Sequence, residues 1–299
     1  MAILSPKEKL QRLYNDLVLG RSRVRIVPAT TNWSAQETPI FIIGLPRSGT
    51  TLLRYVVDSH SRICCPPESN FIGELEALLA SQDSRNGLES MGFSEDHVIA
   101  RLREFSLYFW SNYALSKGKP RWADKSTSYI RHTNFLYKLY PEAQYLIIYR
   151  HGMDQVHSLT NGGKVVPKQL EPYLVNGEDV RIAGARHWVE WTQQLLAFEA
   201  QQPNQCFSLR YEDLCEFPEI KLKQVFCFLD EIWEPTILQF NEFDHDKGPE
   251  HGRTSVTNNF TISRGRWHSW PTDITDYCLD IMAPTLQKLN YMHSSPQAD

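Results

Sequence analysis

A short apolar run that leads directly into a glycine-bracketed loop is the feature that most constrains the fold. Residues 39–43 read PIFII, which is apolar, largely β-branched and without polar alternation. Such a run is typical of a strand buried on both faces of a parallel sheet. The loop 44–51 follows at once, and residues 50–57 have the composition of a helix. The sequence therefore predicts a strand, a loop and a helix in direct succession.

The same alternation of strand and helix recurs downstream. Residues 144–149 (QYLIIY) and 206–211 (CFSLRY) are apolar runs between helical patterns, and residues 62–65 are a candidate for a short fourth strand. Strands that alternate with helices predict right-handed βαβ units. We expect an α/β fold in which residues 39–299 form a single P-loop-type domain with a central parallel sheet flanked by helices. An N-terminal helix and linker are expected over residues 1–38.

Composition restricts the partners that the chain can bind. The 31 Lys and Arg residues nearly balance the 35 Asp and Glu residues, which argues against a nucleic-acid-binding protein. The amino terminus lacks the apolar core of a signal peptide, and no stretch is long enough to span a membrane. We therefore expect neither a nucleic-acid nor a membrane partner. The oligomeric state is left open.

The cysteines point to a reducing compartment. Six cysteines occur without a CxxC pair, mostly inside apolar runs. This pattern predicts buried free thiols and a cytoplasmic location.

The loop 44–51, with the sequence GLPRSGTT, has the glycine spacing of a phosphate-binding P-loop. The glycines permit a tight turn, and the helix that follows presents unpaired N–H groups to an anion. A nucleoside-triphosphatase carries Lys directly after the second glycine, but this chain has Thr50 there and places its cation at Arg47. The pattern favours a 5′-phosphate over a metal-bound triphosphate. Read alone, the two glycines are also compatible with an ordinary strand-to-helix turn.

The segment GLPRSGTTLL resembles the 5′-phosphosulfate-binding loop of sulfotransferases that use 3′-phosphoadenosine 5′-phosphosulfate (PAPS). The family motif is Pro-Arg/Lys-Ser-Gly-Thr-Thr, and the resemblance extends over about residues 39–291. It is strongest to the branch that includes tyrosylprotein sulfotransferases and sulfotransferase domains of polyketide pathways. The resemblance implies that the cofactor is bound by Pro46, Arg47, Ser48, Gly49, Thr50 and Thr51.

A second element of the resemblance follows the strand at 144–149. Arg150 stands at the carboxyl end of that strand, where open α/β sheets bind ligands, and Ser158 lies eight residues later. In the family, an Arg and a Ser at this spacing bind the 3′-phosphate of PAPS. His151 departs from the usual Asp or Asn. A strand-terminal Arg taken alone is also typical of a surface ion pair.

Two further cofactor contacts are implied near the end of the chain. Tyr211 ends the last strand-like run, and the family places a Tyr there near the adenine, although a packed core Tyr is the simpler interpretation. Arg264 and Gly265 belong to the element SRGRW, which the resemblance places near the 3′-phosphate.

The resemblance also implies a general base. In the sequence PPES, Glu68 occupies the position of the catalytic Glu in this branch of the family. A carboxylate in hydrogen-bond reach can take the proton that an acceptor hydroxyl loses as it attacks sulfur. His60, His132 and His187 are the competing candidates, because animal cytosolic sulfotransferases use a His.

Lys125 completes the expected catalytic set of Glu68, Arg47 and Lys125. It lies in the segment WADKST, ahead of a helix that Ser126 or Thr127 could cap. The family lysine in this position helps to hold the transferring group.

The function expected from these residues is transfer of a sulfonate from PAPS to a hydroxyl or amine. The acceptor is expected to be a small molecule or a carrier-bound metabolite, and the product is adenosine 3′,5′-bisphosphate, with no metal required. Acceptor contacts are expected from residues 70–115, 160–187 and 241–262. Residues 241 to about 266 are expected to form no regular element. The alternatives are a small-molecule kinase that uses its P-loop for ATP, and a non-catalytic nucleotide-binding module.

Overall fold

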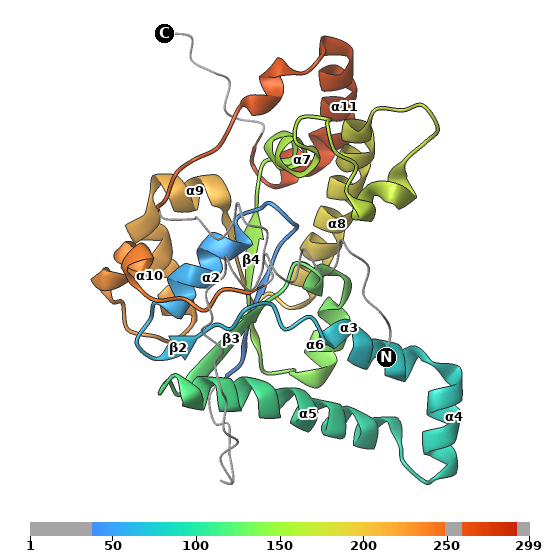
Figure 1. The fold of residues 1–299 in the computed structure, drawn as a ribbon, viewed down its shortest axis with the longest axis vertical. Coiled ribbons are helices and arrows are strands. Elements are labelled where there is room, and N and C mark those ends of the chain that lie inside the picture. Colours follow the sequence, from blue (N-terminus) through green and yellow to red (C-terminus); the bar gives the residue numbers. More distant parts are fainter. Residues whose placement is uncertain (1–37, 249–258, 292–299) are drawn as a thin grey trace, which may run out of the picture.

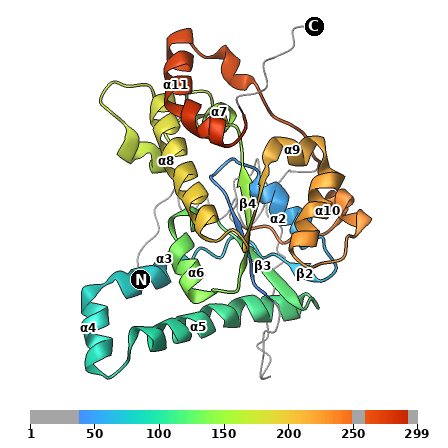
Figure 2. The same ribbon diagram turned by 180° about the vertical axis from the view of Figure 1, so that it is seen from behind.

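A computed structural model describes residues 38–248 and 259–291 (Figures 1 and 2). Its centre is a five-stranded sheet in the order β2-β3-β1-β4-β5, and every strand pair is parallel. The strands are β1 (Ile40–Ile43), β2 (Ile63–Cys64), β3 (Arg121–Lys125), β4 (Gln144–Tyr149) and β5 (Cys206–Arg210). The predicted α/β class and parallel sheet are confirmed. The helix expected within residues 1–38 lies outside the described residues.

Strand β3 was not predicted, and its sequence explains why. It reads RWADK, and all five residues are buried although three carry charged groups. Strand β3 pairs with β1, so that Ile42 lies opposite Lys125 on one side and opposite Leu146 on the other. Apolar content is the main sequence signal for a buried strand, and β3 lacks it. Its charged side chains remain buried because other side chains and carbonyl groups pair with them.

Helices cover both faces of the sheet, and alternate residues of β1 point to opposite faces. Phe41 and Ile43 pack on one side, and Ile40 and Ile42 pack on the other. The first face is covered by α5 (Glu95–Ser116), α6 (Thr133–Leu139), α7 (Gly152–Thr160), α8 (Val180–Gln201) and α11 (Thr272–Lys288). The second face is covered by α2 (Thr50–Asp58), α9 (Tyr211–Glu216), α10 (Pro218–Phe228) and η3 (Pro235–Glu242). Figures 1 and 2 show α6 and α8 on one side of the strands and α2 and α10 on the other.

The remaining helices lie at the periphery. Helices α3 (Ile72–Ala80) and α4 (Gln82–Ser90) extend away from the sheet together with the start of α5 (Figure 1). Three short 3-10 helices complete the described part of the chain: η1 (Tyr129–Arg131), η2 (Lys168–Tyr173) and η4 (Arg266–Ser269). None of the described helices is long and apolar enough to cross a membrane.

Three local predictions have clear outcomes. All six cysteines are free, but Cys227 is exposed, so the prediction of buried thiols is wrong there. The predicted cap by Ser126 or Thr127 is also wrong: α6 starts later, after His132, and no side chain caps it. The described residues between η3 and η4 form no helix or strand, as expected, and residues 249–258 lie outside the described part.

Candidate functional site

The loop between β1 and α2 turns through two residues with left-handed backbone conformations, Arg47 (φ 72°) and Gly49 (φ 100°). A side chain at Gly49 would also collide with Tyr211, because a Cβ atom there would lie 2.5 Å from Cδ2 of the ring. The turn delivers the chain directly into α2, whose first N–H groups have no acceptor within the helix. This geometry suits a bound anion.

Four of the predicted cofactor-binding residues lie together beside this loop, and we call Arg47, Arg150, Ser158 and Tyr211 the arginine cluster. Arg150 donates from Nη1 to the carbonyl oxygen of Arg47 at 2.8 Å, and its guanidinium lies 4.8 Å from the centre of the Tyr211 ring. Arg47 donates from Nε to the hydroxyl of Ser158 at 3.1 Å. Arg150 is therefore not a surface ion-pair residue. Its side chain is buried and bonds to the backbone of the loop.

Two of the predicted phosphate-binding residues each have a buried polar atom without a hydrogen-bond partner among the described residues, Oγ of Ser48 and Nε of Arg150. Leaving such groups unpaired costs about 1–3 kcal/mol each. Both belong to residues predicted to bind phosphate groups, and a phosphate oxygen could accept from either. The residues present therefore fit an anionic nucleotide.

Two contacts that the sequence analysis did not anticipate stabilise the arginine cluster. Gln155 donates from Nε2 to the carbonyl oxygen of Pro46 at 2.9 Å, and the carboxylate of Asp154 accepts from the backbone N–H of Gly265 at 2.6 Å. Burial raises the pKa of Asp154, while the nearby Arg150 cation opposes that shift. Both side chains lie in the first turns of α7, directly after Arg150, which is the signal that could have pointed to them.

The last predicted cofactor element is only partly assembled here. Gly265 has a left-handed backbone (φ 77°) and starts η4, and the neighbouring carbonyl of Ser263 accepts from Arg150 Nη2. The side chain of Arg264, however, is 66% exposed and approaches Glu216 at 4.0 Å. The side chain of Arg264 therefore does not reach the arginine cluster. The group of this segment that contacts Arg150 is the backbone carbonyl of Ser263.

His151, the departure from the family pattern, is neutral in its surroundings. Burial, and then the charge of Arg150, lowers the pKa of His151 to about 4. Its backbone N–H donates to Oε1 of Glu212 at 3.0 Å. The residue therefore adds no positive charge beside Arg150 at neutral pH.

A second group, the carboxylate cluster, consists of Glu68, Lys125 and Thr51. Lys125 donates from Nζ to Oε1 of Glu68 at 2.7 Å and lies 3.5 Å from Oγ1 of Thr51. The Lys125 side chain is 1% exposed and the Glu68 side chain 20% exposed, so the carboxylate is the accessible member of the pair. Since Thr51 lies in the first turn of α2, directly after the glycine-bracketed loop, this cluster adjoins the arginine cluster through that loop.

The three competing histidines have other partners. His60 is fully buried, lies 3.0 Å from the carbonyl oxygen of Ile232 and stacks on Phe226. His132 pairs with Glu76 on α3, and His187 packs between rings of Tyr173 and Trp191. None of these contacts includes a residue of the carboxylate cluster.

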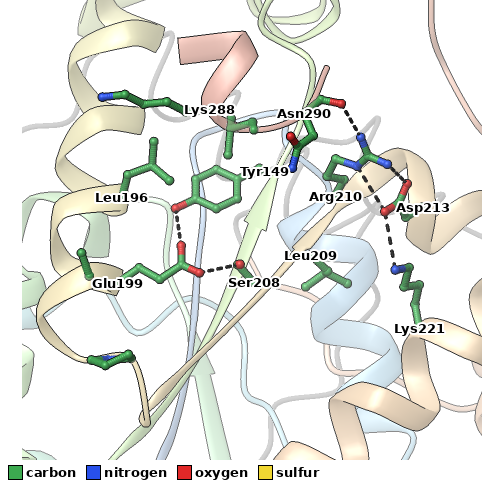
Figure 3. Close-up of a pocket in the computed structure, with 13 residues that line it drawn as sticks. Tyr149, Leu196, Glu199, Ser208, Leu209, Arg210, Asp213, Lys221, Lys288 and Asn290 are labelled. Atoms are coloured by element: carbon green, nitrogen blue, oxygen red, sulfur yellow. Dashed lines mark hydrogen bonds and ion pairs between the residues drawn. The ribbon is translucent and has the colours of Figure 1, made fainter. Parts of the chain in front are cut away.

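An open depression of about 630 Å³ lies at the β5 edge of the sheet, between α8, α10 and α11 (Figure 3). Its polar side chains pair with one another: Glu199 accepts from Tyr149 and Ser208, and Arg210 pairs with Asp213. No predicted site residue lines it. The predicted site residues lie at the ends of β1, β3, β4 and β5, and Tyr149 and Arg210 of the depression are the chain neighbours of Arg150 and Tyr211.

Comparison with known sequences shows distant relatives. The chain is 26% identical to a protein-tyrosine sulfotransferase of Drosophila melanogaster over 218 residues, which is 70% of this chain and 41% of the relative. It is also 26% identical to protein-tyrosine sulfotransferase 1 of Danio rerio, over 68% of this chain and 56% of the relative. The nodulation protein NoeE of Sinorhizobium fredii is 25% identical over 79% of this chain. The chain thus spans about half the length of the first two relatives.

Comparison with solved structures supports the fold. The sulfotransferase domain of the curacin biosynthetic pathway matches with a TM-score of 0.59 at 21% identity, over 85% of this chain and 98% of that domain. The sulfotransferase domain of the Synechococcus PCC 7002 olefin synthase matches with a TM-score of 0.58 at 18% identity, with the same coverage. The model of the sulfotransferase family matches residues 39–235, more than half of the 299 residues, and the chain therefore belongs to the sulfotransferase family.

Proposed function

We propose that this chain transfers a sulfonate group from PAPS to the hydroxyl of an acceptor, with Glu68 as the general base. The observation that carries the proposal is the arrangement of Glu68 and Lys125 beside Thr51, in the first turn of α2 after the phosphate-binding loop. A proton acceptor and a buried cation thereby lie next to the loop that is suited to a phosphosulfate.

The arginine cluster is proposed to hold the nucleotide. The N–H groups at the start of α2, the hydroxyl of Ser48 and the guanidinium of Arg150 supply donors for phosphate oxygens. Tyr211 lies against Gly49 and Arg150, where its ring can pack against the adenine of the nucleotide. Arg264 is left out of this part of the proposal because its side chain points to Glu216.

PAPS supplies an activated sulfonate with adenosine 3′,5′-bisphosphate as the leaving group. Glu68 takes the proton from the attacking hydroxyl, which is general-base catalysis worth about 10²–10⁴-fold. Lys125 and the loop N–H groups hold the negative charge that develops on the leaving phosphate. The residues act by position and charge, without a covalent enzyme intermediate.

The acceptor is proposed to be a small molecule or a carrier-bound metabolite. Sequence relatives of the chain are protein-tyrosine sulfotransferases. The structures with a similar fold are sulfotransferase domains of the curacin biosynthetic pathway and of an olefin synthase. A panel of acceptors separates these classes: p-nitrophenol, a β-hydroxyacyl phosphopantetheine and a tyrosine-containing acidic peptide, each with ³⁵S-labelled PAPS.

The experiment compares Glu68→Gln with Glu234→Gln on the best acceptor of the panel. Glu234 is a matched control because its side chain is 26% exposed, similar to that of Glu68. Its carboxylate accepts from Ser61, which precedes β2 and so lies at the end of the sheet opposite to the site. We expect Glu68→Gln to lower kcat by at least about 100-fold and Glu234→Gln to leave it within about twofold.

Two results would contradict the proposal. Full activity of Glu68→Gln would exclude Glu68 as the base. Binding of ATP with Mg²⁺ in preference to adenosine 3′,5′-bisphosphate, with no transfer from PAPS to any acceptor, would favour the kinase alternative.

A further inference from the structure

Three consecutive residues at the end of β3 hold three consecutive residues of the segment that carries Glu68. Lys125 pairs with Glu68 itself, as described above. On either side of Lys125, Asp124 accepts from the hydroxyl of Ser69 at 2.7 Å, and Ser126 donates to Oδ1 of Asn70 at 2.8 Å. The end of β3 is therefore bonded to the Glu68 segment at three successive positions.

From this arrangement we infer that Asp124 and Ser126 are positioning residues that fix Glu68 against the phosphate-binding loop. The inference rests on the proposed role of Glu68 and adds to it the groups that orient the base. Neither Asp124 nor Ser126 is expected to touch the acceptor or the nucleotide, since both side chains are completely buried.

Asp124 is itself held in one orientation. The same carboxylate oxygen that accepts from Ser69 also accepts from the hydroxyl of Tyr129. The Tyr129 ring packs edge-on against Phe41 of β1, with ring centres 5.8 Å apart. A buried carboxylate is costly for a fold unless it is well hydrogen-bonded, so packing alone does not explain an Asp at this position. Ser69 and Tyr129 supply hydrogen bonds to Oδ2 of Asp124, whereas Oδ1 has no partner among the described residues.

Ser126 fixes the other end of the segment. Asn70, two residues after Glu68, has a left-handed backbone (φ 54°), which Asn tolerates better than most residues. The Ser126 hydroxyl donates to Asn70 and also accepts the backbone N–H of Ser128 at 3.2 Å. The segment that follows Glu68 is thereby bonded to the turn that follows β3.

These bonds matter because Lys125 has two tasks. It pairs with Glu68, and in the proposed mechanism it also stabilises charge on the leaving group. When it does the latter, Asp124 and Ser126 still hold the Glu68 segment in place. A displacement of about 1 Å at a reacting group can cost on the order of 10²-fold in rate, so this support affects catalysis directly.

The test uses Ser69→Ala and Ser126→Ala, alone and combined, in the full chain. Each variant removes one hydroxyl from a link and leaves Asp124 and Asn70 in place. We expect each to lower kcat about fivefold, and the pair about 30-fold, with the affinity for adenosine 3′,5′-bisphosphate within about twofold. Ser69→Thr, which keeps the hydroxyl, is expected to recover most of the rate.

Hydrogen exchange gives a second readout that needs no acceptor. We expect faster exchange at residues 66–70 in both Ala variants and unchanged exchange in the loop 44–51. Tyr129→Phe and Tyr140→Phe form a matched pair. Both rings pack on Phe41, but the Tyr140 hydroxyl bonds to Ser106 instead of Asp124. Only Tyr129→Phe should loosen residues 66–70.

The outcomes separate this inference from the proposed function. If Glu68→Gln abolishes transfer while both Ala variants keep wild-type rates and exchange, Asp124 and Ser126 are structural residues only, and the inference is wrong. If Glu68→Gln keeps full activity, the proposed base is wrong, whatever the Ala variants do.

Discussion

The two clusters of the site are built by different kinds of contact. In the arginine cluster and beside it, side chains hold the backbone of the loop: Arg150 donates to the carbonyl group of Arg47, and the neighbouring Gln155 donates to that of Pro46. One side-chain pair, Arg47 with Ser158, adds to these contacts. In the carboxylate cluster, side chains hold side chains, as Lys125 does with Glu68. The first arrangement shapes the loop whose N–H groups are proposed to bind an anion, and the second sets the place of the carboxylate proposed as the general base. The comparison indicates that nucleotide affinity and turnover can be damaged separately.

The largest difference between the loss of turnover and the loss of nucleotide affinity is expected for Lys125→Met. The variant removes the buried cation beside Glu68 and Thr51, and loss of one such charge-stabilising donor costs about 10²–10³-fold in kcat. Affinity for adenosine 3′,5′-bisphosphate should fall much less, because the arginine cluster is intact. Steady-state kinetics and calorimetry on one preparation measure both quantities.

Lys119→Met is the matched control for that variant. Nζ of Lys119 donates to the carbonyl groups of Asp58, at the end of α2, and of Ile63, at the start of β2. The control should unfold at a lower denaturant concentration and keep its kcat. Equal loss of kcat in both variants would mean that Lys125 acts on folding alone.

A smaller effect is expected on the free energy of unfolding, through the buried carboxyl of Asp124, which bonds to Ser69 next to Glu68. Burial raises the pKa of Asp124 from 3.8 to about 6, against the opposing hydrogen bonds from Tyr129 and Ser69. The folded state therefore binds the proton more tightly than the unfolded chain. This contribution to stability is present below pH 4 and is lost as the pH rises through 6.

The expected size of that contribution is about 3 kcal/mol, since one pKa unit corresponds to about 1.4 kcal/mol. Urea unfolding of the wild type and of Asp124→Asn, at a series of pH values from about 4 to 7, measures it. The difference in unfolding free energy should shift in favour of Asp124→Asn as the pH rises. A difference that is independent of pH would show that the Asp124 carboxyl does not titrate in this range.

The two clusters also differ in how far the sequence predicts them. The strand, the glycines and Arg47 are contiguous, so local spacing was enough to predict the loop. The strand end drew attention to Arg150, but its role came from the resemblance, since its place alone also suits a surface ion pair. Glu68 and Lys125 could be named only from a resemblance, because they are 57 residues apart and nothing local announces their contact. Asp124 was missed for a related reason: a charged residue in a buried strand is explained only by distant partners such as Ser69. The role of Arg264 stays a prediction: a matching motif does not fix where a side chain points, and here it points to Glu216.

The most direct test of the account is calorimetric titration with adenosine 3′,5′-bisphosphate, with ATP and Mg²⁺ as the comparison, on the wild type, Arg150→Ala and Arg264→Ala. The account predicts that the wild type prefers the bisphosphate and that Arg150→Ala weakens it at least about tenfold, since hydrogen bonds to charged groups contribute about 1.5–3 kcal/mol. Arg264→Ala, which removes an exposed side chain, should change the affinity less than about twofold. A preference for ATP with Mg²⁺, or equal effects of the two Arg variants, would contradict it.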